Sequence, residues 1–440
     1  MISRKRGGPD LRGIARQLTL PCVSRYLSRM VRRRHVYHVA GYDPIDAGAQ
    51  YRRFRRQIDV FQRTWNVRAT LSEAGQSDEQ SRAWWTVEAR AGNWQVEATH
   101  DILIWDDIVR ADFVRSLPVR LLDAARVYAD FIATGTMFRY IVANPRYAGF
   151  FLFPVLSLAL FAFGGWLVAY LLIRLLGLEG AAAAVTGVVA GVAAFLGLLR
   201  WPGGRWRVQQ LLDDWIFAHD YLHGRRPDVD ARLDRFAQAL VAQSRDSTLD
   251  EIVIVGHSLG AMLAIDILVR ALALDPDFGR GGVKICLLTV GATIPKFALH
   301  PRAQDIRDRI ARVVAEPSIV WTEYQSRDDT ISFYKFDPVA LRRIPGDRLD
   351  GKPVIRRVQI HDMVTAETFA RCRRNILRLH YRSVMANDRR ATYDYYLLTC
   401  GPVAFHDWTA SPGGLLDFVA GDGTYRVPPY CPTKVAEPAS

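Results

Sequence analysis

Cysteine is scarce in this chain, with five among 440 residues, and none of the five forms a C-x-x-C pair. They are widely spaced and odd in number, so the sequence predicts neither a disulfide framework nor a zinc finger. Cys286 lies in an apolar run and is expected to be a small core residue. This cysteine usage fits a reducing compartment.

Several other motifs are absent. The chain has no H-E-x-x-H, no Asp-rich calcium loop and no G-x-x-x-x-G-K-[ST] loop, so we expect neither a metal nor a cofactor. It has no aromatic signature of RNA-binding domains, and nucleic acid is not an expected partner. No apolar segment follows the Arg-rich opening, which excludes a secretory signal. Residues 1–33 are expected to be a basic, disordered tail, although their Arg and Ser content also resembles an organelle transit peptide.

Acidic residues are fewer than basic ones, 45 against 58, which gives a formal net charge of +13. The basic residues gather in two blocks, residues 25–34 and residues 200–207, and the second block directly follows an apolar segment. Basic residues beside a hydrophobic span favour an anionic membrane surface over nucleic acid as the partner.

Two uncharged runs, residues 149–173 and residues 181–199, stand close together. At about 1.5 Å per helical residue each is long enough to cross a hydrocarbon core of roughly 30 Å. Gly187 and Gly191 form a small-x-x-x-small step that would let the second helix approach the first closely. We therefore predict a transmembrane helical hairpin over residues 149–200; the alternative is a buried helical pair within a large core.

Arginines flank the predicted hairpin on both sides. By the positive-inside rule, both flanks and the remaining protein lie in the cytoplasm, so we expect a multi-pass membrane protein with its main domain on the cytoplasmic side. The flanking residues are Arg139, Arg146, Arg200, Arg205 and Arg207.

Strand-like and helix-like runs alternate after the hairpin, which favours a parallel sheet. The expected strands are 251–255, 283–289, 319–324 and 354–360, and the expected helices are 259–273, 303–315 and 366–384. Before the predicted transmembrane hairpin, we expect a strand over residues 34–40 and a polar helix over residues 47–63. Residues 65–105 are predicted to form an insertion rich in β-hairpins.

These runs predict an α/β fold, a mostly parallel sheet with helices on both faces. We divide it into a first part, residues 34–148, and a second part, residues 201–410, separated by the hairpin. Residues 411–440, rich in Gly and Pro, are expected to be an irregular tail.

The strand-like Glu-Ile-Val-Ile-Val is followed by Gly256-His257-Ser258-Leu259-Gly260 and then by an apolar helix. A serine on such a strand-to-helix turn has a strained backbone that exposes its Oγ, and the glycines prevent clashes between strand and helix. Ser258 is the predicted nucleophile, and His257 is expected to pack or orient. Here the chain resembles the α/β-hydrolase superfamily, and within it uncharacterised bacterial membrane-associated members with the Gly41-Tyr42-Asp43-Pro44 turn; the resemblance covers roughly residues 34–402.

The resemblance implies a catalytic triad in the chain order serine, acid, histidine. The strand ending at Tyr324 runs into Asp328 and Asp329, and we prefer Asp329 as the acid because an apolar run follows it; either could instead cap a helix. For the base we prefer His361, which directly follows a strand. The alternatives are His380 and His406. His380 lies deep in a predicted helix, although its Arg-Leu-His context resembles that of the bacterial members. The oxyanion donors would be the backbone of Leu259 and that of Gly41 or Tyr42.

Together these features predict a membrane-anchored serine hydrolase that cleaves carboxylic esters, lipase-like or esterase-like, through an acyl-enzyme. Its expected partners are the bilayer and a lipid-like or other acyl ester substrate. The same triad would also serve an acyltransferase or a thioesterase, and a third alternative is a noncatalytic membrane scaffold that keeps the fold. The sequence carries no signal for an oligomeric state.

Overall fold

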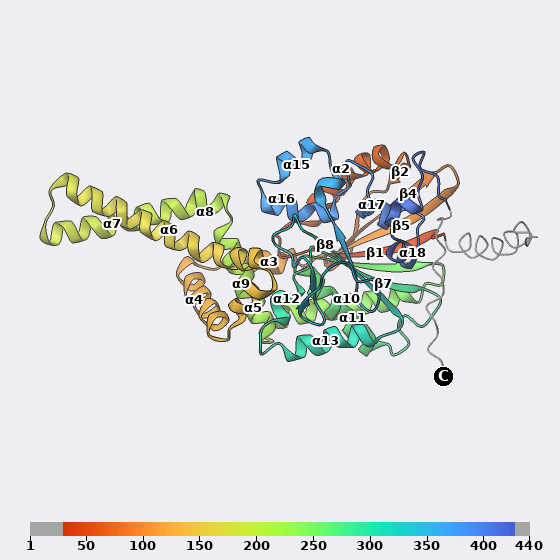
Figure 1. Ribbon diagram of the computed structural model, residues 1–440. Helices are drawn as coiled ribbons and strands as arrows, with labels where there is room; N and C mark the ends of the chain where they lie inside the picture. Colours follow the sequence, from red (N-terminus) through yellow and green to blue (C-terminus); the bar gives the residue numbers. More distant parts are fainter. Residues whose placement is uncertain (1–29, 427–440) are drawn as a thin grey trace, which may run out of the picture.

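A computed structural model describes residues 30–426 of the chain (Figure 1). Within this range nine strands form the main sheet, and eight of them follow one another in the order β11-β8-β7-β6-β1-β5-β4-β2. The six strands from β11 to β5 are parallel to their neighbours: β11 (Val354–Val358), β8 (Ile319–Ser326), β7 (Lys284–Val290), β6 (Glu251–His257), β1 (Arg33–Val39) and β5 (Trp94–Leu103). The prediction of a mostly parallel sheet is confirmed.

The neighbour of β1 in the sheet is β5, a strand that we expected to find in an insertion. The expected insertion over residues 65–105 extends the main sheet, because β5 pairs in parallel with β1 along its length. The antiparallel edge beyond it consists of β4 (Arg82–Ala91), β2 (Arg68–Leu71) and the short β3 (Gly75–Gln76).

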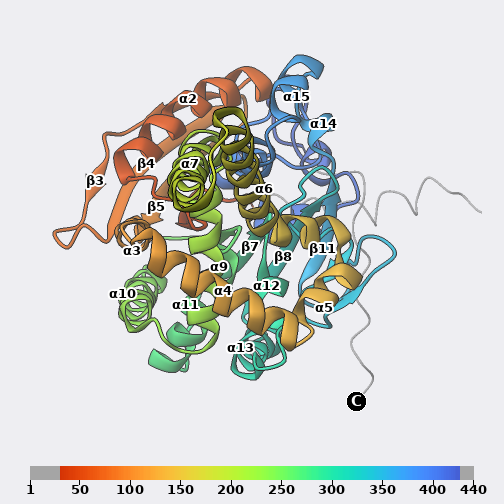
Figure 2. The ribbon, with the colours of Figure 1, turned by 90° about the vertical axis from the view of Figure 1, so that its left-hand side faces the viewer.

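Helices cover both faces of the sheet (Figures 1 and 2). One face packs against α10 (Pro227–Ser244), α11 (Gly260–Leu274) and α13 (Gln304–Ala315). The other packs against α2 (Ala47–Trp65), α17 (Tyr395–Cys400) and α18 (Phe405–Ala410). The central strands are buried on both faces, which explains why they read as continuous apolar runs rather than as alternating ones.

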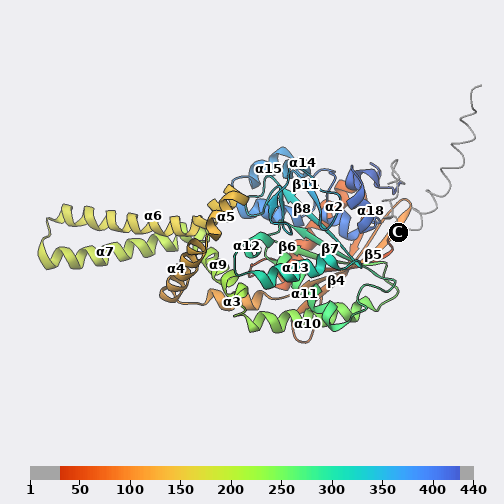
Figure 3. The same cartoon turned by 60° about the horizontal axis from the view of Figure 1, so that its bottom comes forward.

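Two long antiparallel helices, α6 (Pro145–Leu176) and α7 (Gly180–Arg200), project from the body (Figure 3). The first has a mean hydropathy of 2.1, and the second, with the short α8 (Pro202–Arg205), 2.2, so both are long and apolar enough to cross a membrane by length and composition. A Cβ on Gly165 would lie 2.6 Å from the carbonyl oxygen of Gly191, so the two backbones meet at the predicted glycine step.

The base of the hairpin consists of α4 (Leu117–Ala133) and α5 (Thr136–Ala143), which lead into it, and α9 (Val208–Leu222), which follows it. An aromatic cluster joins these helices, with Trp215 of α9 in edge contact with Phe131 of α4 and Phe151 of α6. The two helices of the hairpin are therefore continuous with a packed helical layer on the body. α3 (Asp106–Phe113) connects this layer to β5.

The predicted helix over residues 366–384 is broken. It forms α15 (Ala366–Cys372), α16 (Ile376–His380) and a 3-10 turn over Tyr381–Val384. Asn375 causes the break, because its side chain accepts a hydrogen bond from the backbone of Arg378 and starts a new helix. His380 consequently lies at the end of a short helix.

The two predicted tails are partly ordered. Val31 is buried and donates its backbone N–H to Pro402, and the first strand begins at Arg33. Leu415 and Phe418 are buried in the core, and the Trp94 indole donates to the carbonyl of Gly423. The remaining parts of the two predicted tails, residues 1–29 and 427–440, lie outside the described residues.

Candidate functional site

Ser258 stands at the turn between β6 and α11, at the carboxyl ends of the parallel strands. Its φ is +58°, a left-handed conformation that a non-glycine residue adopts at a cost of about 1–2 kcal/mol. A Cβ on Gly256 would lie 2.5 Å from the Cα of Ala261, and one on Gly260 would lie 2.2 Å from the carbonyl oxygen of Val39. Both glycines are therefore required for this strained turn to pack against its own helix and against β1.

Asp329 and His380 form a buried carboxylate–imidazole pair beside this turn. Their Oδ2 and Nδ1 atoms are 2.7 Å apart, and both side chains are almost fully buried. The other carboxylate oxygen of Asp329 accepts the backbone N–H of Ile331 at 3.0 Å, which fixes the carboxylate plane. Because Nδ1–H donates to Asp329, Nε2 of His380 carries the free lone pair.

Nε2 of His380 is buried and makes no hydrogen bond within the described part of the chain. His380 and Ser258 line one pocket. A serine, a histidine and an aspartate in the predicted chain order are thus brought together, with an unpartnered basic nitrogen in the pocket that contains the serine.

His361 does not join this arrangement. Its Nδ1 lies 3.4 Å from Asp328, and its side chain is 46% exposed against 4% for His380. It follows β11, the edge strand, which stands three strands from β6, or roughly 14 Å at about 4.8 Å per strand. The structure therefore corrects the preference for His361: the imidazole that pairs with Asp329 and lines the serine pocket is that of His380.

Asp328, the alternative acid, has a different partner from Asp329. Its carboxylate accepts the backbone N–H of Ile360 at 2.8 Å, at the start of α14 (Ile360–Met363). This is a capping role, which stabilises the exposed orphan donors of a helix start.

His406 lies on α18, at the other end of the strands. The neighbouring Phe405 donates its backbone N–H to Glu251, the first residue of β6, whereas Ser258 follows the last residue. His406 is exposed and is about a full strand length from the serine, roughly 20 Å for seven residues.

The loop after β1 contacts the serine directly. A Cβ on Gly41 would lie 2.8 Å from the Cβ of Ser258 and 3.2 Å from its Oγ, so the Gly41 backbone packs closely against the serine. Leu259 is buried at the N-cap of α11, where backbone N–H groups are free of helical partners. Gly41 and Leu259 thus stand on either side of Ser258.

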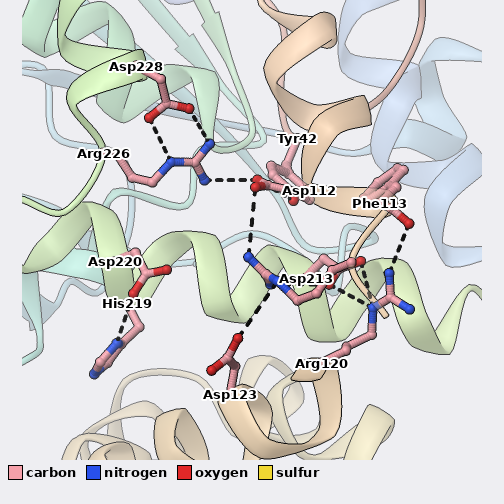
Figure 4. A network of polar contacts seen from close by, with 11 residues as sticks. Tyr42, Asp112, Phe113, Arg120, Asp123, Asp213, His219, Asp220, Arg226 and Asp228 are labelled. Carbon is pink, nitrogen blue, oxygen red and sulfur yellow. Dashed lines mark hydrogen bonds and ion pairs between the residues drawn. The ribbon is translucent and has the colours of Figure 1, made fainter. Parts of the chain in front are cut away.

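A network of side-chain hydrogen bonds and ion pairs holds Tyr42, which belongs to this loop (Figure 4). Its hydroxyl donates to Asp112 at 2.9 Å, and Arg226 donates to the same carboxylate at 2.8 Å and also binds Asp228. Burial and the Asp112 charge raise the pKa of Tyr42, so the phenol remains a donor. The network fixes the loop from outside the pocket.

Three further contacts surround the His380 segment, and of these the sequence predicts only a packing role for His257. The Tyr381 hydroxyl donates to Asp43 of the Gly41 loop, which links the loop to the histidine segment. His257 packs its ring 4.6 Å from that of His380, and burial lowers its pKa well below the usual value, so it is neutral. Gly291, at φ +55°, follows β7, and a Cβ there would lie 3.0 Å from Cε1 of His380.

The pocket extends from the serine to the base of the hairpin. Its lining includes Tyr147 and Phe150 from the start of α6, and Arg207 and Leu211 from the segment that follows the hairpin. Deeper in the wall, the Lys296 ammonium lies 2.6 Å from Asp214. One wall is therefore part of the helix that continues into the projecting apolar pair.

The model of the alpha/beta hydrolase family matches residues 198–418. This range includes Ser258, Asp329 and His380 and begins at the end of the hairpin. No curated protein and no solved structure matches the chain.

Proposed function

This chain belongs to the alpha/beta hydrolase family, and we propose that it is a serine hydrolase that cleaves carboxylic esters with Ser258, His380 and Asp329. The observation that carries the proposal is the strained Ser258, at φ +58°, in one pocket with His380, whose Nδ1 is paired with the buried Asp329 and whose Nε2 is unpartnered within the described residues. A strained serine and a buried imidazole with an unpartnered nitrogen each lower the stability of the folded protein. A role in catalysis explains why both are present.

In the proposed reaction, Nε2 of His380 takes the proton of Ser258 as Oγ attacks the ester carbonyl carbon. The carbonyl becomes an oxyanion, which the backbone N–H of Leu259 and one from Gly41 or Tyr42 stabilise. His380 then returns the proton to the leaving alcohol as the C–O bond breaks, and an acyl-enzyme remains. Water activated by the same imidazole releases the carboxylic acid, and Asp329 keeps the tautomer throughout.

The substrate is proposed to be lipid-like, because the pocket is continuous with the hairpin. Tyr147 and Phe150 line the pocket and belong to α6, whose next turns expose Leu156, Leu160 and Phe163. Large apolar side chains in contact with water are unfavourable, and a bilayer around α6 and α7 would cover them. An acyl chain would then pass from the bilayer along α6 to the serine.

The proposed topology places the body on the cytoplasmic side. Both ends of the hairpin carry arginines, Arg146 before it and Arg200 and Arg205 after it, which is the bias of cytoplasmic flanks. Cysteine accessibility on spheroplasts tests this: a cysteine at the hairpin tip, Gly177→Cys, should react with a membrane-impermeant maleimide from outside, whereas a cysteine at Arg235 of the body should not. The reverse pattern would contradict the topology.

The proposed activity is tested with detergent-solubilised full-length protein and a series of p-nitrophenyl esters and diacylglycerols. We expect hydrolysis that Ser258→Ala removes, while Ser244→Ala on α10 has no effect. Hydrolysis that survives Ser258→Ala would refute the assignment, and absence of hydrolysis together with unchanged phenotype of Ser258→Ala would support a noncatalytic scaffold. Product analysis with an added alcohol acceptor, and with acyl thioesters, separates hydrolysis from acyl transfer and thioester cleavage.

A further inference from the structure

A cluster of histidines and aspartates lies away from the serine pocket, between the helices that precede and follow the hairpin. Asp130 comes from α4, and His219 and His223 come from α9. One ligand-type atom from each of the three lies within 4.8 Å of the others. His219 and His223 are four residues apart and share one face of the helix.

We propose that Asp130, His219 and His223 bind one divalent transition-metal ion, with Zn²⁺ as the favoured class. Two imidazoles and one carboxylate are typical donors for Zn²⁺, whereas Mg²⁺ and Ca²⁺ prefer oxygen alone. Nε2 of His219 lies 3.5 Å from Oδ2 of Asp130, close to the ligand-to-ligand spacing of roughly 3.3 Å that a tetrahedral site with 2.0–2.1 Å bonds requires.

His223 supplies the second observation. Its Nδ1 is 2.8 Å from the backbone carbonyl of His219, so Nδ1 carries the proton and Nε2 carries a lone pair. That Nε2 is buried and has no hydrogen-bond partner within residues 30–426. A buried acceptor without a partner is costly in a hydrogen-bonded cluster, and a metal ion would satisfy it.

The surroundings have the form of an outer coordination shell. His300 accepts the backbone N–H of Arg302 on Nδ1 at 3.2 Å, so its Nε2–H donates to Asp130 at 2.8 Å. Nδ1 of His219 faces Asp220 at 3.7 Å (Figure 4). Carboxylates and imidazoles in such positions orient metal ligands and fix their tautomers.

The site would join the two segments that flank the hairpin. Asp130 is in α4, before the hairpin, and the two histidines are in α9, after it, so a bound ion would fasten α4 to α9 within the base of the hairpin. With three protein ligands, a fourth position remains for water. The inference does not depend on the proposed esterase activity.

The test uses full-length, detergent-solubilised protein in a Ser258→Ala background, with any tag removed and metal stripped. Co²⁺ titration should give visible d–d bands of a low-symmetry site at one equivalent, and competition with a chromophoric chelator should give the Zn²⁺ affinity. His223→Gln should lower that affinity at least roughly tenfold, and the His219→Gln/His223→Gln pair should abolish the bands. His406→Gln, an exposed histidine, is the matched control and should bind as the parent does.

Thermal unfolding provides an independent readout. Zn²⁺ should raise the Tm of the parent and leave the Tm of the double variant unchanged, because only binding to the folded state adds stability. Absence of Co²⁺ bands in the parent, or equal Zn²⁺ affinity in the parent and the double variant, would overturn the proposal.

Discussion

Two consecutive aspartates, Asp328 and Asp329, each face a histidine, and the two pairs differ in almost every physical respect. Asp329 and His380 are 2.7 Å apart with side chains 3% and 4% exposed, whereas Asp328 and His361 are 3.4 Å apart with side chains 18% and 46% exposed. In the first pair His380 lines the pocket that contains Ser258, and the second pair lies at the edge strand, where Asp328 caps a short helix.

The comparison shows that burial is the main physical difference between the proposed catalytic pair and an ordinary surface pair. An exposed ion pair is screened by water and contributes little, about 0–1 kcal/mol. A buried carboxylate fixes one tautomer of its histidine and leaves the other nitrogen as a directed base. Sequence proximity to a strand does not distinguish the two pairs, because both aspartates follow the same strand.

Replacing each of the two histidines in turn is expected to give the largest difference in kcat. His380→Gln removes the proposed base, and we expect ester hydrolysis to fall on the order of 10⁶-fold in kcat, as for the loss of a triad histidine. His361→Gln, an exposed position, should change kcat by less than about threefold. Steady-state kinetics on one ester measures both; equal losses, or a larger loss in His361→Gln, would reverse the assignment of the two pairs.

Replacing each of the two aspartates in turn is expected to give the next largest difference in kcat. Asp329→Asn should lower kcat roughly 10⁴-fold, because the amide favours the wrong imidazole tautomer while the shape is kept. Asp328→Asn should leave kcat within about threefold and lower the unfolding free energy by less than about 1 kcal/mol, because asparagine also caps helices. If kcat falls more in Asp328→Asn, the capping role of Asp328 is wrong.

A third variant tests how tightly the buried pair is packed. Gly291→Ala places a methyl group 3.0 Å from Cε1 of His380 on a backbone with φ +55°. We expect roughly a tenfold to a hundredfold loss of kcat, because small displacements of a catalytic group are costly. Gly281→Ala, where a Cβ meets open space, is the control and should retain full activity.

The smallest expected effect concerns the link between the histidine segment and the Gly41 loop. Tyr381→Phe removes the hydroxyl that donates to Asp43. A lost hydrogen bond is worth about 1 kcal/mol, so kcat/KM should fall about fivefold. Tyr51→Phe, which removes an exposed hydroxyl bond to Ser72, is the control; equal effects of the two substitutions would show that the link is unimportant for catalysis.

Much of the fold was predictable because it rests on local signals. Apolar runs between turn residues predict the central strands, and the glycines around Ser258 predict the strand-to-helix turn, whose close contacts require glycine. Two uncharged runs identified the hairpin. The sheet order was not predictable, since β5 joins β1 through pairings more than 60 residues apart, which no local pattern encodes.

The preference for His361 over His380 rested on a predicted continuous helix that the structure does not contain. The sequence predicts one continuous helix with His380 about 20 Å from its start, at about 1.5 Å per residue, but α15 ends at Cys372 and Asn375 begins another helix. Asparagine followed by apolar residues is a helix-start signal, and it was available in the sequence. The bond between Asp43 and Tyr381 joins residues 338 apart, so only the folded structure could reveal it.

The most direct test of the account is covalent labelling with a fluorophosphonate, mapped by peptide mass spectrometry. The account predicts that the wild-type protein and His361→Gln are labelled on Ser258 at similar rates, that His380→Gln is labelled far more slowly, and that Ser258→Ala is not labelled. Labelling of another serine, or labelling of Ser258 that depends on His361 and not on His380, would contradict it.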